Sequence, residues 1–382
     1  MSTLKVNNIQ NANGTSAIAI DSSGVATFSK TLVPSSSMMY RNLIINGDMR
    51  IDQRNAGASV TLPSNNSYYT IDRFAFTINQ ASKMSAQQVT DAPTGFVNSL
   101  KVTTTSAYTV TASDYFSVRQ DIEGQNISHL DWGSSNAKTV TLSFYVKSSL
   151  TGTFGGSIKN SASDKAYPYT YTIDSANTWE RKTITIEGET TGTWLTTNGR
   201  GIMVYFGLGV GSTFSGTSGS WASSNYLSAT GATSVVGTSG ATWYVTGVQL
   251  EIGDAATPFE HRPYDAELTR CQRYYYKMSG ASNYLRFATG FVGAGSTTTA
   301  YCYFHPPVTM RDKPTSIDWS ASIGLWGGGA ISAISALAIE TGAASTTSVN
   351  LQVTSTGLTQ YTPMFVMGNN SSTASIAVSA EL

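Results

Sequence analysis

The sequence predicts an all-β protein, and three observations support this. Apolar and polar residues alternate with a period of two in many short segments, as in 140–146 and 202–210. Turns rich in Ser, Thr and Gly separate these segments. Charged residues make up only 12% of the chain, so the outward strand faces are expected to carry Thr and Ser rather than Lys and Glu. The one helix signal lies at 264–277, where Pro263 can begin a helix without losing a hydrogen bond.

Residues 1–40 are predicted to form a separate attachment and trimerisation segment. Short apolar sets that suit strands alternate here with turn signals such as Asn13-Gly14. So few apolar side chains cannot bury a core within one copy of the segment. We therefore expect it to pair with copies of itself around a threefold axis or to dock on another protein.

Residues 41–263 are predicted to form a jelly-roll β-sandwich. At least eight alternating segments occur in this region and no blade-like repeat is visible, which favours two packed sheets over a propeller. The alternation changes phase at Gly247, which predicts a β-bulge. The stretch 211–240 is rich in Ser, Gly and Thr and is expected to be a long surface excursion.

A short helical hinge is predicted at 264–277, followed by a small distal β-sandwich tip at 278–382. The alternating pattern restarts after the hinge and continues to Leu382, so we expect the last strand to be tied into a sheet. Tyr274, Tyr275 and Tyr276 leave the hinge and are predicted to pack between domains or subunits.

The charge balance argues against nucleic-acid and membrane partners. Lys and Arg together number 23, as do Asp and Glu, so the formal net charge is zero and no basic footprint is expected. No stretch is apolar enough to span a bilayer, and the N-terminus lacks the pattern of a secretory signal. Cys271 and Cys302 are the two cysteines, and both are predicted to be free and buried.

No motif predicts catalysis, a cofactor or a metal. His129, His261 and His305 have no partner at zinc-site spacing, and neither a nucleophile elbow nor a phosphate loop occurs. Asp48 with Glu251 could hold a structural calcium ion, but a turn-capping role for Asp48 is favoured because calcium requires six or more oxygens. A pair of carboxylates for glycoside cleavage stays an open alternative.

Aromatic side chains are the candidate binding residues, because their flat apolar faces can stack on sugar rings. Trp132 and the alternating set 167, 169 and 171 are further aromatics, for which packing inside the protein is the favoured role. Trp326 is the preferred candidate, since three glycines follow it closely and leave few side chains to bury its indole. The predicted binding residues are Trp326, Trp319, Tyr284, Tyr301 and Tyr303.

Three segments carry a resemblance to a known class of proteins: TPFEHRPYDAELTRCQRYYYK at 257–277, RNLIINGDMRIDQRNAG at 41–57 and PVTMRDKPT at 307–315. The first resembles a junction found in tail-fibre and receptor-binding proteins of tailed bacteriophages, in which a carbohydrate-binding-like jelly roll ends in a short helix. The second resembles the first strand of that jelly roll, and the third the start of the distal domain.

The resemblance implies an elongated homotrimer in the virion tail, assembled in the host cytoplasm and acting outside the host cell. Residues 1–40 would attach it to a virion tail or adaptor protein. The tips would bind host surface polysaccharide or lipopolysaccharide, with multivalency replacing strong single contacts. Two alternatives remain: a structural head or neck fibre or decoration protein without a receptor, and, less favoured, a glycan-degrading tailspike.

Overall fold

A computed structural model describes residues 8–10, 16–20, 22, 26–28, 40–280, 282–340 and 342–382. Its contacts divide the chain into two compact units, Met1–Arg41 and Asn42–Leu382. In the first unit three strands pair antiparallel in chain order, namely β1 (Asn8–Gln10), β2 (Ser16–Ile20) and β3 (Ala26–Phe28). The predicted turn at Asn13-Gly14 lies outside the described residues, and pairing between copies stays a prediction.

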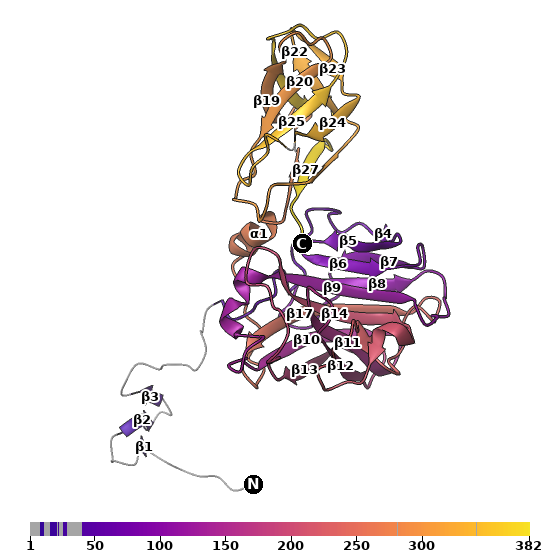
Figure 1. Ribbon diagram of the computed structural model, residues 1–382, viewed down its shortest axis with the longest axis vertical. Helices are drawn as coiled ribbons and strands as arrows, with labels where there is room; N and C mark the ends of the chain where they lie inside the picture. Colours follow the sequence, from indigo (N-terminus) through magenta and orange to yellow (C-terminus); the bar gives the residue numbers. More distant parts are fainter. Residues whose placement is uncertain are drawn as a thin grey trace. The chain divides into compact units, whose positions relative to one another are not determined.

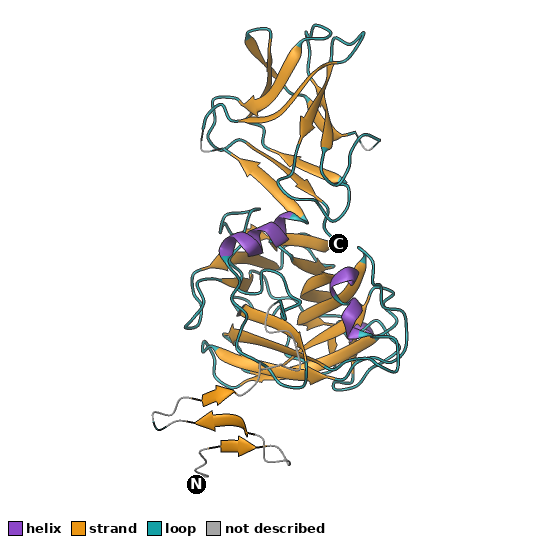
Figure 2. Cartoon of the chain, turned by 90° about the vertical axis from the view of Figure 1, so that its left-hand side faces the viewer, coloured by secondary structure: helices purple, strands orange, loops and turns teal. Residues whose placement is uncertain are grey.

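Two six-stranded antiparallel sheets form a jelly-roll sandwich in the second unit (Figures 1 and 2). The first sheet has the order β13 (Glu180–Ile186), β10 (Val140–Ser148), β17 (Thr242–Ile252), β8 (Ser99–Thr104), β7 (Met84–Val89) and β4 (Val60–Thr61). The second has the order β12 (Ala166–Ile173), β11 (Gly152–Asn160), β14 (Arg200–Val210), β9 (Tyr115–Glu123), β6 (Phe74–Ile78) and β5 (Asn65–Ile71).

The predicted alternation is confirmed by the core between these sheets. Phe144, Phe206 and Trp243 are fully buried there, and the ring centroids of Phe144 and Phe206 lie 5.1 Å apart. The predicted bulge is also present, since the pairing of β10 with β17 shifts between Ser143 and Tyr145. On β17 the bulge contains Gly247, whose φ of 61° favours glycine.

The excursion at 211–240 covers part of the outward face of the second sheet. It contains the 3-10 helix η3 (Ser212–Phe214) and two short parallel strands, β15 (Ser215–Gly216) and β16 (Ser228–Ala229). Phe214 packs edge-on against Tyr115 of β9, with ring centroids 5.3 Å apart. Two more 3-10 helices, η1 (Gly124–Asn126) and η2 (Ser128–Leu130), follow β9.

The predicted hinge is a helix followed by a strand. Helix α1 (Tyr264–Gln272) begins directly after Pro263, as expected, and Asp265 and Glu267 in its first turn suit the positive end of the helix dipole. The chain then turns into β18 (Tyr275–Ser279), which belongs to the distal fold. The boundary predicted between residues 277 and 278 therefore falls inside a strand. No helix in the described part of the chain is long and apolar enough to cross a membrane.

The distal fold is a second sandwich, of a three-stranded and a seven-stranded sheet. Its buried core includes Cys302, Leu325 and Val366. The smaller sheet has the order β18, β27 (Ser375–Ser379) and β21 (Ser316–Trp319). The larger has the order β23 (Ala330–Ala333), β22 (Ile323–Gly327), β26 (Pro363–Gly368), β19 (Arg286–Val292), β20 (Thr299–Phe304), β25 (Val349–Thr354) and β24 (Ala336–Ile339).

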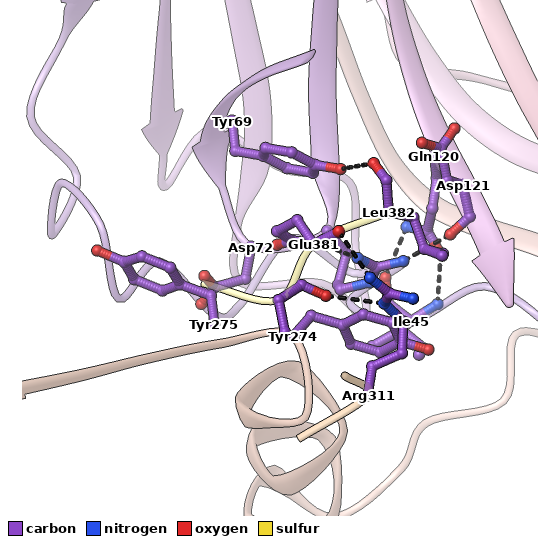
Figure 3. A network of polar contacts seen from close by, with 12 residues as sticks. Ile45, Tyr69, Asp72, Gln120, Asp121, Tyr274, Tyr275, Arg311, Glu381 and Leu382 are labelled. Carbon is purple, nitrogen blue, oxygen red and sulfur yellow. Dashed lines mark hydrogen bonds and ion pairs between the residues drawn. The ribbon is translucent and has the colours of Figure 1, made fainter. Parts of the chain in front are cut away.

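The last residues of the chain join the two sandwiches through a buried polar network (Figure 3). The final strand ends at Ser379, three residues earlier than the alternation predicts. The carboxylate of Glu381 then pairs with Arg54 at 2.8 Å and with Arg73, whose side chain is 1% exposed. The guanidinium of Arg73 also lies 3.5 Å from the ring centroid of Tyr274.

A third cation, Arg311, completes this connection. Arg311 of the distal sandwich donates to the carbonyl of Ala380 at 2.8 Å and to the carbonyl of Asn198 in the jelly roll at 2.8 Å. Tyr69 of the jelly roll donates its hydroxyl to the carbonyl oxygen of Leu382 at 3.3 Å. The two sandwiches are thus linked both through α1 and through the segment after β27.

Candidate functional site

Two rows of aromatic side chains lie on the outward face of the seven-stranded sheet. In the first row, Trp326 of β22 pairs with Phe365 of β26, and their ring centroids lie 5.5 Å apart. Phe365 pairs with Thr289 of β19, which in turn pairs with Tyr303 of β20. Since neighbouring strands are about 4.8 Å apart, the row from Trp326 to Tyr303 spans ~14 Å.

The second row runs parallel to the first, two residues along each strand. Pro363 of β26 pairs with Phe291 of β19, which pairs with Tyr301 of β20. Tyr301 pairs onward with Gln352 of β25. We define the aromatic face as Trp326, Phe365, Phe291, Tyr301 and Tyr303.

The aromatic face is open to solvent and nearly uncharged. Phe291 is 47% exposed and Tyr303 is 43% exposed, whereas Trp326, Phe365 and Tyr301 are half-buried. Arg286, at the start of β19, lies over the rings of Phe365 and Trp326, with its guanidinium 4.5 and 5.9 Å from their centroids. Such a surface offers flat apolar areas bordered by hydroxyl and amide groups, which suits a ligand rich in both C–H and O–H groups.

The structure brings together three of the five predicted binding residues. Trp326, Tyr301 and Tyr303 belong to the aromatic face, while Tyr284 lies before β19 and is 52% exposed. Trp319 lies on β21 in the other sheet, where it packs against the distal core. It also lines a polar cleft of about 810 Å³ between the sandwiches, together with Tyr69 and Lys277.

Sequence reasoning missed Phe291 and Phe365. Both stand in alternating segments, which predict a strand but not which of its two sides faces solvent. Val292 and Val366, the next residues in the sequence, are fully buried. Because side chains alternate along a strand, Phe291 and Phe365 must point to the opposite, outward side. The signal was therefore present in the period of two, but the face that it marks depends on sheet pairing.

The remaining aromatic candidates are packed inside the jelly roll. Tyr169 and Tyr171 are 1% and 5% exposed in the core, and Tyr167 packs against its edge. Trp132 forms edge-to-face contacts with Trp194 and Trp221, and its indole N–H donates to the carbonyl of Lys138 at 2.8 Å. These rings hold loops together, in agreement with the favoured packing role.

The candidate calcium residues have other partners. Asp48 pairs with Arg50, and Glu251 accepts a hydrogen bond from the Thr257 hydroxyl at 2.6 Å. Within residues 40–280, 282–340 and 342–382, no cluster of three His, Cys, Asp or Glu side chains could hold a metal ion. Cys271 and Cys302 are free and buried, as predicted.

No family model and no curated protein matches this chain. Among solved structures, it is similar to the enzymatically active domain of tailspike protein 4 of Bacteriophage CBA120, at 14% identity and a TM-score of 0.31, over 56% of this chain and 22% of that one. It is also similar to a putative sugar binding protein from Bacteroides thetaiotaomicron, at 13% identity and a TM-score of 0.34, over 56% of this chain and 100% of that one.

A third similarity is to a family 11 carbohydrate-binding module from Clostridium thermocellum, solved with a mixed-linked tetrasaccharide. The identity is 13% and the TM-score 0.27, over 53% of this chain and 98% of that one. This chain spans about a fifth of the tailspike structure and nearly all of the two sugar-related ones.

Proposed function

We propose that this protein is an adhesion protein that binds a surface glycan through the aromatic face. The observation that supports this most is the pair of aromatic rows on the outward face of the seven-stranded sheet, where Phe291 and Tyr303 are exposed to solvent. An exposed apolar patch of this kind costs solubility and is commonly retained for binding. Sugar rings present C–H faces to aromatic rings and hydroxyls to neighbouring Thr, Gln and Tyr groups, which this surface supplies.

In this role the protein would belong to a homotrimeric tail fibre of a bacteriophage. Residues 1–40 would attach it to the virion, and its distal sandwich would bind host polysaccharide or lipopolysaccharide. Support comes from the contacts between two segments that carry the resemblance. Arg262 donates to the carbonyl of Ile44 at 3.0 Å and pairs with Glu267 of α1 at 3.1 Å. The segments at 41–57 and 257–277 thus form one buried junction, although Ile44 and Arg262 lie 218 positions apart in the sequence.

Adhesion of this type does not require bond cleavage. Three weak tips on each fibre would act together, because the second and third contacts become effectively intramolecular once the first has formed. Release of reducing ends from a bound polysaccharide would contradict this part of the proposal and would favour the tailspike alternative.

Binding to immobilised bacterial polysaccharides and lipopolysaccharides tests the proposal, with the full-length protein and a Phe291→Ala/Trp326→Ala double variant. We expect the double variant to bind at least about tenfold more weakly, since an aromatic hot spot at the centre of an interface contributes about 2 kcal/mol or more. Tyr264→Ala is the matched control, because Tyr264 is a 56% exposed aromatic on α1, outside the face. Equal binding by the double variant and the wild type would overturn the assignment of the face.

The same face also suits a contact between subunits, which would favour the structural-fibre alternative. Light scattering on the same variants distinguishes the two roles. A glycan-binding face predicts an unchanged particle mass with reduced glycan binding. A subunit contact predicts a lower mass in the double variant.

A further inference from the structure

A separate cavity of about 260 Å³ lies on the outward face of the second jelly-roll sheet. Its base is formed by side chains from three neighbouring strands. Tyr205 of β14 pairs with Arg119 of β9, and Lys159 of β11 pairs with Met203 of β14. The surface excursion closes one side of the cavity with Phe214, Asn225 and Leu227.

Lys159 is the unusual member of this cavity. The residue is 3% exposed, and its ammonium donates one hydrogen bond to the side-chain oxygen of Asn225. The ammonium also lies 5.2 Å from the ring centroid of Tyr205. Among the described residues, no carboxylate forms an ion pair with Lys159. An ammonium can donate three hydrogen bonds, so N–H groups of this buried cation remain for a ligand.

The surrounding charges compensate for this cation only in part, because Asp121 favours it while Arg119 and Arg200 oppose it. Asp121, whose side chain is fully buried, pairs with Arg119 at 2.9 Å and with Arg200 at 3.0 Å. One carboxylate therefore serves two guanidiniums, and Lys159 adds a further positive charge beside them. Burial, reinforced by the charge of Arg119, lowers the pKa of Lys159 to about 8. A buried cation without a counter-ion costs stability, which an anionic ligand would recover.

We propose that this cavity binds the carboxylate of an acidic sugar, a uronic acid, with the Lys159 ammonium as its counter-ion. This inference rests on the proposed glycan recognition and adds a second site with a defined substrate class. The lining fits one sugar ring, since Met203, Tyr205 and Phe214 offer apolar contacts while Ser161, Ser163 and Asn66 offer hydroxyl and amide partners.

The guanidinium of Arg119 is already hydrogen-bonded within the protein, and this favours a monovalent carboxylate over a phosphate group as the ligand. Arg119 donates to the carbonyl of Asn66 at 2.7 Å and to the hydroxyl of Thr77 at 2.8 Å, besides its pairing with Asp121. The guanidinium of Arg119 is therefore occupied. Arg200, which also lines the cavity, pairs with Asp121 at 3.0 Å and donates to the carbonyl of Leu382 at 2.6 Å. The Lys159 ammonium is thus the group best placed for a ligand, and it is a point charge rather than the bidentate fork that suits phosphate.

The methyl group of Met203 gives a direct readout, because this residue lines the cavity. Full-length protein labelled with [13C-methyl]methionine is titrated with methyl β-D-glucuronide and with uncharged methyl β-D-glucoside, and Met203→Leu assigns the signal. We expect a saturable shift of the Met203 methyl with the glucuronide only. Lys159→Gln should weaken that binding about 10- to 100-fold, because hydrogen bonds to charged groups contribute about 1.5–3 kcal/mol.

Two further variants separate charge from structure. Lys159→Arg keeps the charge and should retain part of the binding. Lys165→Gln removes a lysine that follows β11 and donates to Ser223 at 3.2 Å, so it should bind like the wild type. Absence of a saturable Met203 shift with glucuronide would overturn the inference. An equal shift with inorganic phosphate would overturn the assignment to an acidic sugar.

The two proposals fail separately in this design. Loss of polysaccharide binding in the Phe291→Ala/Trp326→Ala variant concerns the aromatic face and should leave the Met203 signal unchanged. If glucuronide does not shift the Met203 methyl signal in a protein that still binds immobilised polysaccharide, only the cavity proposal is rejected.

Discussion

The second jelly-roll sheet and the seven-stranded distal sheet both have side chains that alternate between an inward and an outward face. Their outward faces differ in what they carry and in whether loops cover them. On the second jelly-roll sheet, the outward-facing residues include Arg119 of β9, Lys159 of β11 and Tyr205 of β14. Loops cover these side chains, so all three are buried. On the seven-stranded distal sheet, the equivalent positions carry the aromatic face, which no described loop buries. The covered face is charged and the uncovered face is apolar, the reverse of what solvation alone would favour.

This reversal indicates what each face contributes. Buried charges need specific partners, so the covered face fixes geometry and binds one defined chemical group. Exposed aromatics need no fixed partner, so the uncovered face can accept ligands in several positions. We therefore expect changes on the covered face to affect stability, and changes on the uncovered face to affect binding.

The largest expected effect is at Glu381, whose buried charge network joins the two sandwiches. Glu381→Ala removes the carboxylate shared by Arg54 and Arg73, and leaves Arg73 as a buried charge without its main partner. We expect the free energy of unfolding to fall by about 3–5 kcal/mol, measured by urea denaturation. Asp174→Ala is the control, since Asp174 is 74% exposed beside Lys182 and its loss should cost less than about 1 kcal/mol. Equal effects would show that the network does not hold the sandwiches together.

Two neighbouring residues of β20, Tyr303 and Phe304, allow an exposed and a buried aromatic side chain to be compared within one strand. Phe304 is 1% exposed and packs near Tyr276, whereas Tyr303 is 43% exposed on the aromatic face. Phe304→Ala should destabilise the protein by about 3–5 kcal/mol, while Tyr303→Ala should cost less than about 1 kcal/mol. Thermal unfolding of both variants measures this. A comparable loss in Tyr303→Ala would mean that the face is structural.

The smallest effect concerns the pH dependence contributed by Lys159. Its pKa is about 8 in the folded protein, against 10.5 for the ordinary side chain, so between these values the unfolded chain binds a proton that the folded chain does not. Stability should therefore rise from pH 8 to pH 10.5, by on the order of 1–3 kcal/mol. Urea midpoints for the wild type and Lys159→Met across this range isolate the contribution, because the variant should lack it. Parallel pH profiles would contradict the burial of a charged Lys159.

The sequence predicts the fold class well because strand alternation and turn residues are local signals. The phase change at Gly247 even locates the bulge in β17. The end of the hinge is less visible, because Tyr274 to Tyr276 suit either a helix end or a strand, and pairing with the distant β27 decides for the strand.

The candidate sites are less predictable, because they depend on contacts between distant segments. Composition singles out Trp326, Tyr301 and Tyr303, but only sheet pairing shows that Phe291 and Phe365 share their face. Lys159 carries no local signal at all. Its burial results from the excursion that brings Asn225, 66 residues later, to its ammonium.

The connection through Glu381 has a mechanical consequence. Because the distal sandwich is attached at both its first and its last strand, a force applied to its tip divides between the covalent path through α1 and the ion pairs of Arg54 and Arg73. Twisting about residues 273–275 would require those pairs to break first. The distal sandwich would therefore transmit torque to the jelly roll through this junction rather than swivel freely on it.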